Sequence, residues 1–269
     1  MVKRLFLKII PSSYYKDSSI NVFYKWLLIG LLIRLSFMPI TVYYPDLLGI
    51  YWRSSLIAYR KMFQIGGMQV FIHYFHALFL LIFKPLMPYF DTILNDPKMG
   101  MGCTWDMFTT FVSHPYVFRT LFLFKVPYLI FDLGCAFLFL RIFQDNKKGL
   151  RAFKFWIVNP IVIFSTYIAA RFECVIIFFV LLSLYYAKNN SFSKSLLYLG
   201  VSIIIKFYSL IFLPFFIIIL GRNLRERLKL TFWGLLPFGI LIFLNKMFYG
   251  AAGLKGLATA HQASYFLTM

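Results

Sequence analysis

Five isolated charged residues stand out in a sequence that is otherwise strongly apolar. They are Arg34 within the first apolar run, Asp46 just after it, Arg171 and Glu173 between two later runs, and Lys206 in the middle of a third. A charge at membrane depth is costly, so such residues are candidates for function. Cations can hold a phosphate group, and a carboxylate can accept a proton from an attacking hydroxyl. We expect the topology to bring these charges together at the outer face, where they suit the binding, or the chemistry, of an anionic phosphate.

The composition predicts an integral membrane protein. Of the 269 residues, 61% are hydrophobic and 21% are aromatic, far more than a soluble domain carries. The formal charge of +19 would suggest nucleic acid as the partner of a soluble protein. In this chain many cations flank apolar runs, where they set topology and meet anionic headgroups, so we expect membrane lipids and no nucleic acid as partners. The three scattered cysteines predict neither a disulfide scaffold nor a zinc site.

The basic segments predict how the chain crosses the membrane, because short basic loops stay on the cytoplasmic side. We expect one all-α transmembrane domain over residues 1–269, with an uncleaved basic N-terminus inside, the C-terminus outside, and an outer interfacial region over about residues 42–116. The strongest cytoplasmic marker is the basic cluster between Arg141 and Lys154. The seven expected membrane segments are 22–41, 117–143, 155–169, 174–187, the two arms of a hairpin within 195–220, and 230–244.

The hairpin within 195–220 is predicted from charge. Basic residues lie on both sides of this stretch, and Lys206 stands alone near its middle. If both ends are cytoplasmic, the chain must reverse near Lys206, and the lysine then lies at the tip on the outer side. A single tilted span is the alternative, since about 20 residues cross the hydrocarbon core. It would place the arginines that follow Leu220 outside, so we favour the hairpin.

The outer region begins with an amphipathic run that suits a helix lying in the interface. Asp46 opens this run, where it could cap the helix or act as a general base. Residues 69–90 predict a re-entrant or interfacial helix. His73 and His76 share one face of it, but no third ligand has metal-site spacing, so packing is the favoured interpretation and no metal is assigned. Residues 91–115 are expected to form a lid or a connector.

Four charged residues have ordinary structural explanations as well. Arg34 could reach the interface with its long side chain or bind an anion. Asp132, within the second long span, is expected to bond a polar group on a neighbouring helix rather than to be catalytic. Arg171 and Glu173 could form an ordinary turn with a solvated ion pair.

Two stretches of the chain resemble the polytopic GT-C glycosyltransferases, in particular polyprenyl-phosphate-mannose-dependent mannosyltransferases. Residues 158–186 read VNPIVIFSTYIAARFECVIIFFVLLSLYY, and residues 196–216 read LLYLGVSIIIKFYSLIFLPFF. They are similar to the family's Asn-Pro, its acidic residue at the next outer turn, and its Lys-x-Tyr-Pro apex with a later proline. PDLLGIYW, from Pro45 to Trp52, is similar to the Asp-x-x-x-Tyr of the first outer loop. The sequence departs from the pattern at Ser209, in place of proline, and at Glu173, in place of aspartate.

The resemblance implies an inverting transfer of mannose or another hexose from a polyprenyl-phosphate donor to an acceptor hydroxyl on a glycan or lipid. It places the reaction on the outward face of a multi-pass protein in a bacterial cell membrane. Asp46 would be the catalytic base, and Lys206 and Arg171 would contact the donor phosphate. No cofactor is implied with certainty, and the use of a divalent metal stays open. Family members usually carry more spans, so a truncated chain is expected. The other residues expected to line the substrate site are Glu173, Arg34, Tyr51, Trp52 and Tyr208.

Two other kinds of function remain open from the sequence. A transporter or flippase for an anionic lipid or sugar phosphate would use the same charges, although it would be expected to show internal repeats and a site at the membrane midplane. A membrane scaffold without catalysis would tolerate alanine at the outer charges.

Overall fold

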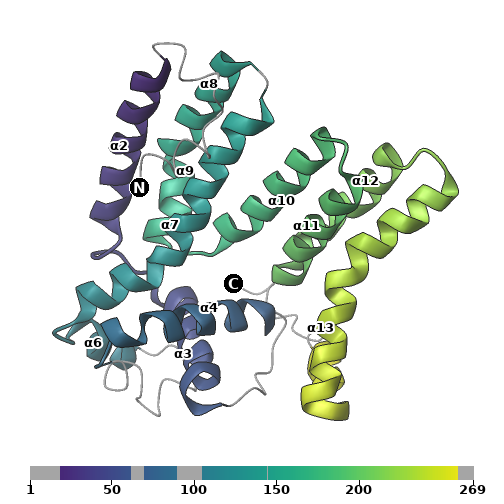
Figure 1. The fold of residues 1–269 in the computed structure, drawn as a ribbon. Helices are drawn as coiled ribbons and strands as arrows, with labels where there is room; N and C mark the ends of the chain where they lie inside the picture. Colours follow the sequence, from purple (N-terminus) through teal and green to yellow (C-terminus); the bar gives the residue numbers. More distant parts are fainter. Residues whose placement is uncertain (1–18, 62–69, 90–104, 144, 260–269) are drawn as a thin grey trace. The chain divides into compact units, whose positions relative to one another are not determined.

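The computed structural model describes residues 19–61, 70–89, 105–143 and 145–259, and every regular element in these ranges is a helix (Figure 1). The all-α prediction is therefore confirmed. Three helical stretches are long and apolar enough to cross a membrane: Ile20–Phe37, Val117–Ile142 and Leu224–Leu244. Shorter apolar helices cover Phe71–Leu86, Phe192–Ile205 and Phe207–Leu220. The chain is thus a helical membrane protein, and the expected total of seven membrane segments stays a prediction.

The helices group into two compact units. One unit contains residues 1–47 and 105–191, and the other contains residues 48–104 and 192–269. Helix α3 (Tyr44–Arg60) passes from the first unit into the second between Leu47 and Leu48.

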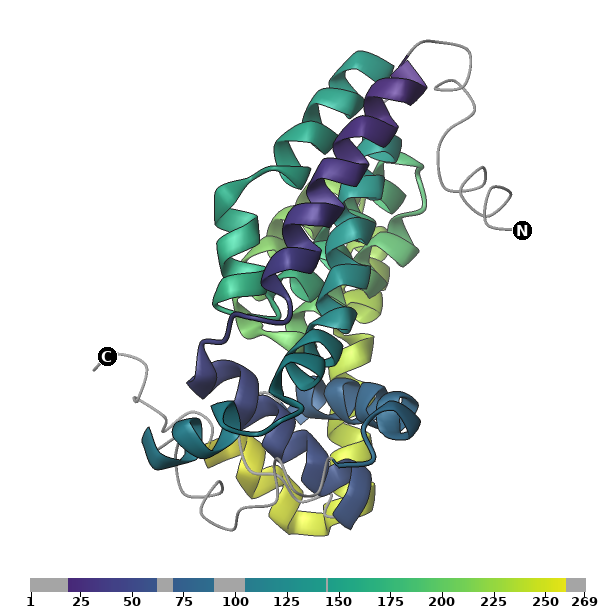
Figure 2. The same cartoon turned by 90° about the vertical axis from the view of Figure 1, so that its left-hand side faces the viewer.

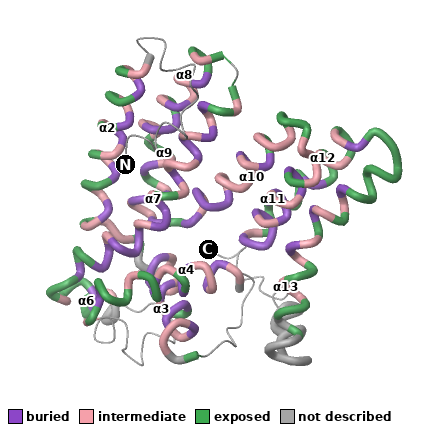
Figure 3. Tube along the Cα trace, in the orientation of Figure 1, coloured by how far each residue is buried: buried purple, intermediate pink, exposed green. Residues whose placement is uncertain are grey.

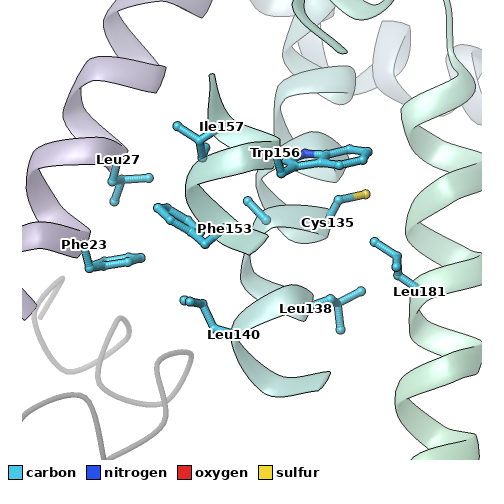
Figure 4. Packing of buried hydrophobic residues seen from close by; sticks show 10 residues of the cluster. Phe23, Leu27, Cys135, Leu138, Leu140, Phe153, Trp156, Ile157 and Leu181 are labelled. Atoms are coloured by element: carbon cyan, nitrogen blue, oxygen red, sulfur yellow. The ribbon is translucent and has the colours of Figure 1, made fainter. Parts of the chain in front are cut away.

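The first unit is built on α2 (Ser19–Phe37), α7 (Val117–Ile142), α8 (Asn146–Ile157) and α10 (Glu173–Lys188). Helix α7 packs against both α8 and α10, and α2 packs against α8, as the two views in Figures 1 and 2 show. A buried apolar cluster joins these four helices (Figure 4). Its members are Phe23, Leu27, Cys135, Ala136, Leu138, Leu140, Phe153, Trp156, Ile157 and Leu181.

Burial differs sharply between the long helices. Half of the candidate span in α7 is buried, against 22% of the span in α2 and 17% of the span in α13 (Leu224–Thr259) (Figure 3). Helices that expose apolar side chains along most of their length need an apolar solvent. Helix α7 is therefore the central helix of its unit, while α2 and α13 present apolar surface suited to lipid.

Helix α8 contains the basic residues that come before the third expected segment, 155–169. The sequence interpretation used these residues as a cytoplasmic marker and assigned them no helix. The structure instead forms an amphipathic helix, with Gly149, Phe153, Trp156 and Ile157 buried and the lysines near its N-terminus exposed. The three later buried residues follow Gly149 by four, seven and eight positions, a spacing that places all four on one face of a helix.

The chain breaks after α8 at the expected Asn-Pro pair. The side chain of Asn159 accepts a hydrogen bond from the backbone N–H of Ile161 at 2.9 Å and so caps the short helix α9 (Pro160–Ile163). A five-residue π-helix, η4 (Phe164–Ile168), follows directly. The chain then turns at Ala170, whose φ of 52° is left-handed, before α10 begins.

The second unit contains the predicted reversal at Lys206. Helix α11 (Phe192–Ile205) ends there, a 3-10 turn η5 (Phe207–Ile211) follows, and α12 (Phe212–Leu220) runs back beside it. Leu196 of α11 and Leu213 of α12 both lie against Gly234 of α13, which shows that the two arms share one side of that helix. The reversal of the chain at Lys206 is therefore confirmed, while the two arms as membrane segments and the side of their tip stay predictions. The expected exit at 230–244 lies inside α13, which continues to Thr259.

Gly200 allows α11 and α13 to approach closely. A Cβ at this position would lie 2.2 Å from the carbonyl oxygen of Gly234 and 3.0 Å from the ring of Pro237. A backbone oxygen cannot move aside as a side chain can, so Gly200→Ala must separate the helices. We expect a loss of about 1–3 kcal/mol, the usual range for overpacking, measured by unfolding in detergent. Gly239→Ala is the control, because its Cβ would meet nothing within 4 Å; equal stability of the two variants would contradict the prediction.

The region expected to lie outside is partly described. Within the expected segment 69–90 the structure forms α4 (Val70–Phe83) and the 3-10 turn η2 (Lys84–Leu86), so a short apolar helix is present there, and its place at the interface stays a prediction. The segment 91–115, expected to be a loop that serves as a lid or a connector, lies outside the described residues up to Thr104. From Trp105 the expectation of a loop is wrong in part, because α6 (Trp105–Val112) is helical.

Candidate functional site

The first unit brings together two of the predicted site residues, Asp46 and Arg171. Nε of Arg171 donates to Oδ2 of Asp46 at 2.9 Å across 125 residues of sequence. Both side chains are open to solvent, at 51% for Arg171 and 39% for Asp46. An exposed pair of this kind contributes little to stability. Its value is geometric, because it holds a carboxylate and a guanidinium together at an accessible position.

The location of Asp46 differs from the favoured prediction. The carboxylate does not cap α3 but lies within its first turn, where the helix dipole favours a negative charge. Arg171 forms its ion pair with Asp46, which is distant in the sequence, and not with its near neighbour Glu173 as the sequence suggested. Glu173 itself is the first residue of α10 and is half-buried.

A second ion pair lies inside the first unit and is closed to solvent. Nε of Arg34 donates to Oδ2 of Asp132 at 2.5 Å, and both side chains have 0% exposure. Nη1 of Arg34 also donates to the carbonyl of Ile157 at 2.6 Å and to that of Gly30 at 3.1 Å. Arg34 therefore occupies neither environment expected of it, since it neither reaches the interface nor lies open to a ligand. The close approach depends on Gly30, whose Cβ would lie 3.2 Å from Nη1 and 2.4 Å from the side chain of Ile157.

Asp132 accepts two further hydrogen bonds. The hydroxyl of Tyr167 donates to Oδ2 at 2.7 Å, and Nε1 of Trp156 donates to Oδ1 at 2.7 Å. The prediction that Asp132 bonds polar groups of neighbouring helices is confirmed. The carboxylate thus joins α7, α2, α8 and η4, and every partner is supplied by a different element. A buried charge with this many partners is satisfied in the way that an apolar surrounding requires.

Sequence reasoning missed a second buried cation, Lys125. Its Nζ donates to the backbone oxygen and to the hydroxyl of Thr41, the latter at 2.8 Å, just beyond the end of α2. The hydroxyl of Thr41 in turn has two carbonyl acceptors at 2.6 Å, that of Phe37 at the end of α2 and that of Tyr167. Lys125 could have been found by the same pattern that identified Lys206, which is a single cation within an apolar span. Lys125 also precedes Asp132 by seven residues, which places the two on one face of α7.

Lys206 belongs to the second unit. It occupies the extended residue between α11 and η5, with φ −155° and ψ 127°. Its Nζ lies 5.6 Å from the ring centroid of Tyr208, a cation–π distance. The structure therefore brings together these two predicted residues at the hairpin tip.

The remaining predicted residues lie in the part of α3 that belongs to the second unit. Tyr51 is fully buried, and its ring packs edge-on against His76 at 4.8 Å; Trp52 beside it is half-buried. Burial lowers the pKa of His76 to about 3, and burial with the nearby charge of Arg53 lowers that of His73 to about 4. Both imidazoles are neutral packing groups at physiological pH. In the described ranges no cluster of three His, Cys, Asp or Glu residues could hold a metal ion.

Comparison with known proteins gives no match: no family model, no curated protein and no solved structure matches this chain. The candidate site is therefore defined by its own geometry.

Proposed function

We propose that this protein is a membrane glycosyltransferase that moves a sugar from a polyprenyl-phosphate donor to an acceptor hydroxyl, with Asp46 as the general base. The proposal is carried by the pair of Asp46 and Arg171, which is a solvent-accessible ion pair within the first unit. The motifs around Asn159, Glu173 and Lys206 support the same reaction class by their resemblance to GT-C enzymes. We expect the site to face outward.

The two residues can divide the chemistry. In the described residues Oδ2 of Asp46 is bonded by Arg171 and Oδ1 has no further partner, so Oδ1 can receive the proton of an acceptor hydroxyl. The acceptor oxygen then attacks the anomeric carbon, and the bond from that carbon to the phosphate oxygen breaks. The polyprenyl phosphate leaves with the bonding electrons, and the configuration at the anomeric carbon inverts.

The leaving phosphate needs positive charge. Arg171 binds Asp46 through Nε alone, and the guanidinium carries four further N–H donors on its two terminal nitrogens. A single arginine can thus orient the base and still meet an anionic oxygen. The resemblance also assigns Lys206 to the donor phosphate, and its role there remains part of the proposal.

The direct test is sugar transfer in proteoliposomes. The protein is reconstituted with radiolabelled polyprenyl-phosphate mannose and a mixture of lipid and glycan acceptors. A labelled product with inverted anomeric configuration supports the proposal. The absence of any labelled glycoside with each hexose donor in turn would overturn it.

A transporter for an anionic lipid or sugar phosphate is the second candidate function. The observation in its favour is the buried pair of Arg34 and Asp132, because charges of this kind inside membrane helices often mark transport pathways. Movement of the labelled donor across the bilayer without a new glycosidic bond would favour this function over the first.

A further inference from the structure

Tyr167 is held at two points by the buried polar network of the first unit. Its hydroxyl donates to Oδ2 of Asp132 at 2.7 Å, and its backbone carbonyl lies 2.6 Å from the hydroxyl of Thr41, whose one proton it shares with the carbonyl of Phe37 at the same distance. The side chain is completely buried. Tyr167 precedes Arg171 by four residues, and Thr41 precedes Asp46 by five. One residue therefore links the two short segments that carry the exposed ion pair.

The segment that leads to Arg171 has an unusual local geometry. The π-helix η4 is closed by the N–H of Ala169, which donates to the carbonyl of Phe164 at 2.7 Å. The N–H of Arg171 donates to the carbonyl of Ser165 at 2.9 Å, and Ala170 between them has a φ of 52°. Single π turns are uncommon and are frequently found at functional sites.

The π turn makes the position of Arg171 depend on helical register. An α-helix advances by about 100° and 1.5 Å for each residue. If η4 changed from π to α hydrogen bonding, the register would shift by one residue. Arg171 would then rotate by about 100° around the helix axis and move away from Asp46. A contact from outside the turn that fixes the register of η4 would therefore also fix the position of Arg171.

The bond from Tyr167 to Asp132 provides this contact. Asp132 lies on α7, the most buried of the three candidate spans, and its position is fixed by Arg34 of α2. The tyrosine hydroxyl thereby ties the π turn to two long helices. The Thr41 bond ties the chain before Asp46 to the same residue, and Lys125 of α7 holds Thr41 in turn.

We infer that Tyr167 is a positioning residue, whose hydroxyl bond to Asp132 sets the register of η4 and so places Arg171 against Asp46. The inference rests on the proposed function for its catalytic consequence, but the placement itself can be measured without any activity. A misplacement of about 1 Å can lower a catalytic rate by roughly 100-fold. Loss of the hydroxyl is therefore expected to lower kcat about 10- to 100-fold.

Trp156 offers a matched control. It donates to the other oxygen of the same carboxylate at the same distance of 2.7 Å, but it lies on α8, which carries neither Asp46 nor Arg171. Tyr167→Phe removes one buried donor to Asp132, and Trp156→Phe removes another, the indole N–H that Oδ1 shares with the backbone carbonyl of Asp132 at 3.2 Å. A purely structural role predicts the same outcome for both variants, whereas positioning predicts a difference.

The first measurement is cross-linking. Asp46→Cys and Arg171→Cys are introduced together with Cys103→Ser, and the two new thiols are joined with a short bis-methanethiosulfonate reagent in proteoliposomes. The native Cys135 and Cys174 are buried. We expect Tyr167→Phe to slow cross-linking several-fold and Trp156→Phe to leave its rate unchanged. The second measurement is kcat for sugar transfer in the chain with Asp46 and Arg171 intact, again for both variants.

The outcomes separate the inference from the proposed function. Slower cross-linking in Tyr167→Phe alone supports the positioning role, even if no sugar transfer is found and the proposed function fails. Equal cross-linking in the two variants overturns the positioning role, even if sugar transfer is confirmed and depends on Asp46. A fall in kcat for Tyr167→Phe with an unchanged KM for the donor further supports positioning, because lost orientation affects the chemical step rather than binding.

Discussion

Replacing Asp46 with asparagine is expected to lower the rate of sugar transfer by about 10²- to 10⁴-fold, the usual contribution of a general base. The amide keeps the shape of the side chain, and its oxygen can still accept a hydrogen bond from Arg171. It cannot take a proton from the acceptor hydroxyl. The original pair is exposed and adds little to stability, so we expect an unchanged melting temperature in detergent. The measurement is the initial rate of labelled product in proteoliposomes.

Asp145→Asn is the matched control for this substitution. Asp145 is also an exposed aspartate of the first unit, and it caps α8 by accepting from the N–H of Lys147 at 2.8 Å. Asparagine caps helices about as well as aspartate. We expect the control to keep the full rate of transfer. Equal rates for Asp46→Asn and the unmodified protein would remove Asp46 from the chemistry.

Replacing Asp132 with asparagine is expected to destabilise the protein by about 3–5 kcal/mol, the cost of leaving one charge of a buried pair without its counter-ion. Asp132 and Arg34 have no exposed side-chain surface, so water cannot solvate the remaining guanidinium. Tyr167 and Trp156 would also lose a charged acceptor. The measurement is the free energy of unfolding in mixed detergent micelles, titrated with a denaturing detergent.

The double variant Arg34→Gln, Asp132→Asn tests the cause of that loss. It removes both charges but keeps polar groups that can bond one another. We expect it to recover most of the lost stability, because replacing a buried ion pair by uncharged groups is often close to neutral. A double variant as unstable as Asp132→Asn, or a loss below about 1 kcal/mol in the single variant, would contradict a buried pair.

The long apolar elements could be predicted from the sequence because each depends mainly on local composition. The spans that became α2 and α7 follow directly from runs of apolar residues. The reversal at Lys206 follows from a lone cation between two basic segments, and the break at Asn159 follows from proline. The helical face of α8 was also present in the spacing of its buried residues, but the exposed lysines obscured it.

The pairing of the charged residues could not be predicted in the same way. Arg34 and Asp132 are 98 residues apart, and Asp46 and Arg171 are 125 residues apart. A charged side chain in an apolar surrounding pairs with whichever partner the helix packing brings within reach. The sequence suggested that Arg171 pairs with its near neighbour Glu173, and that Arg34 reaches the interface or binds an anion. Both expectations were drawn from positions along the chain, without knowledge of which helices are in contact.

The sequence by itself determined that the chain is a helical membrane protein, where its long apolar helices run, and which few charges need an explanation. Hydropathy and charge act locally, so they can be read along the chain. Only the tertiary structure decided that Arg34 is closed off with Asp132, that Lys125 holds Thr41, and that Arg171 meets Asp46 at an accessible position. The first two outcomes follow from the packing of α7 against its neighbours, and the third follows from the tertiary fold that brings the start of α3 beside the turn before α10.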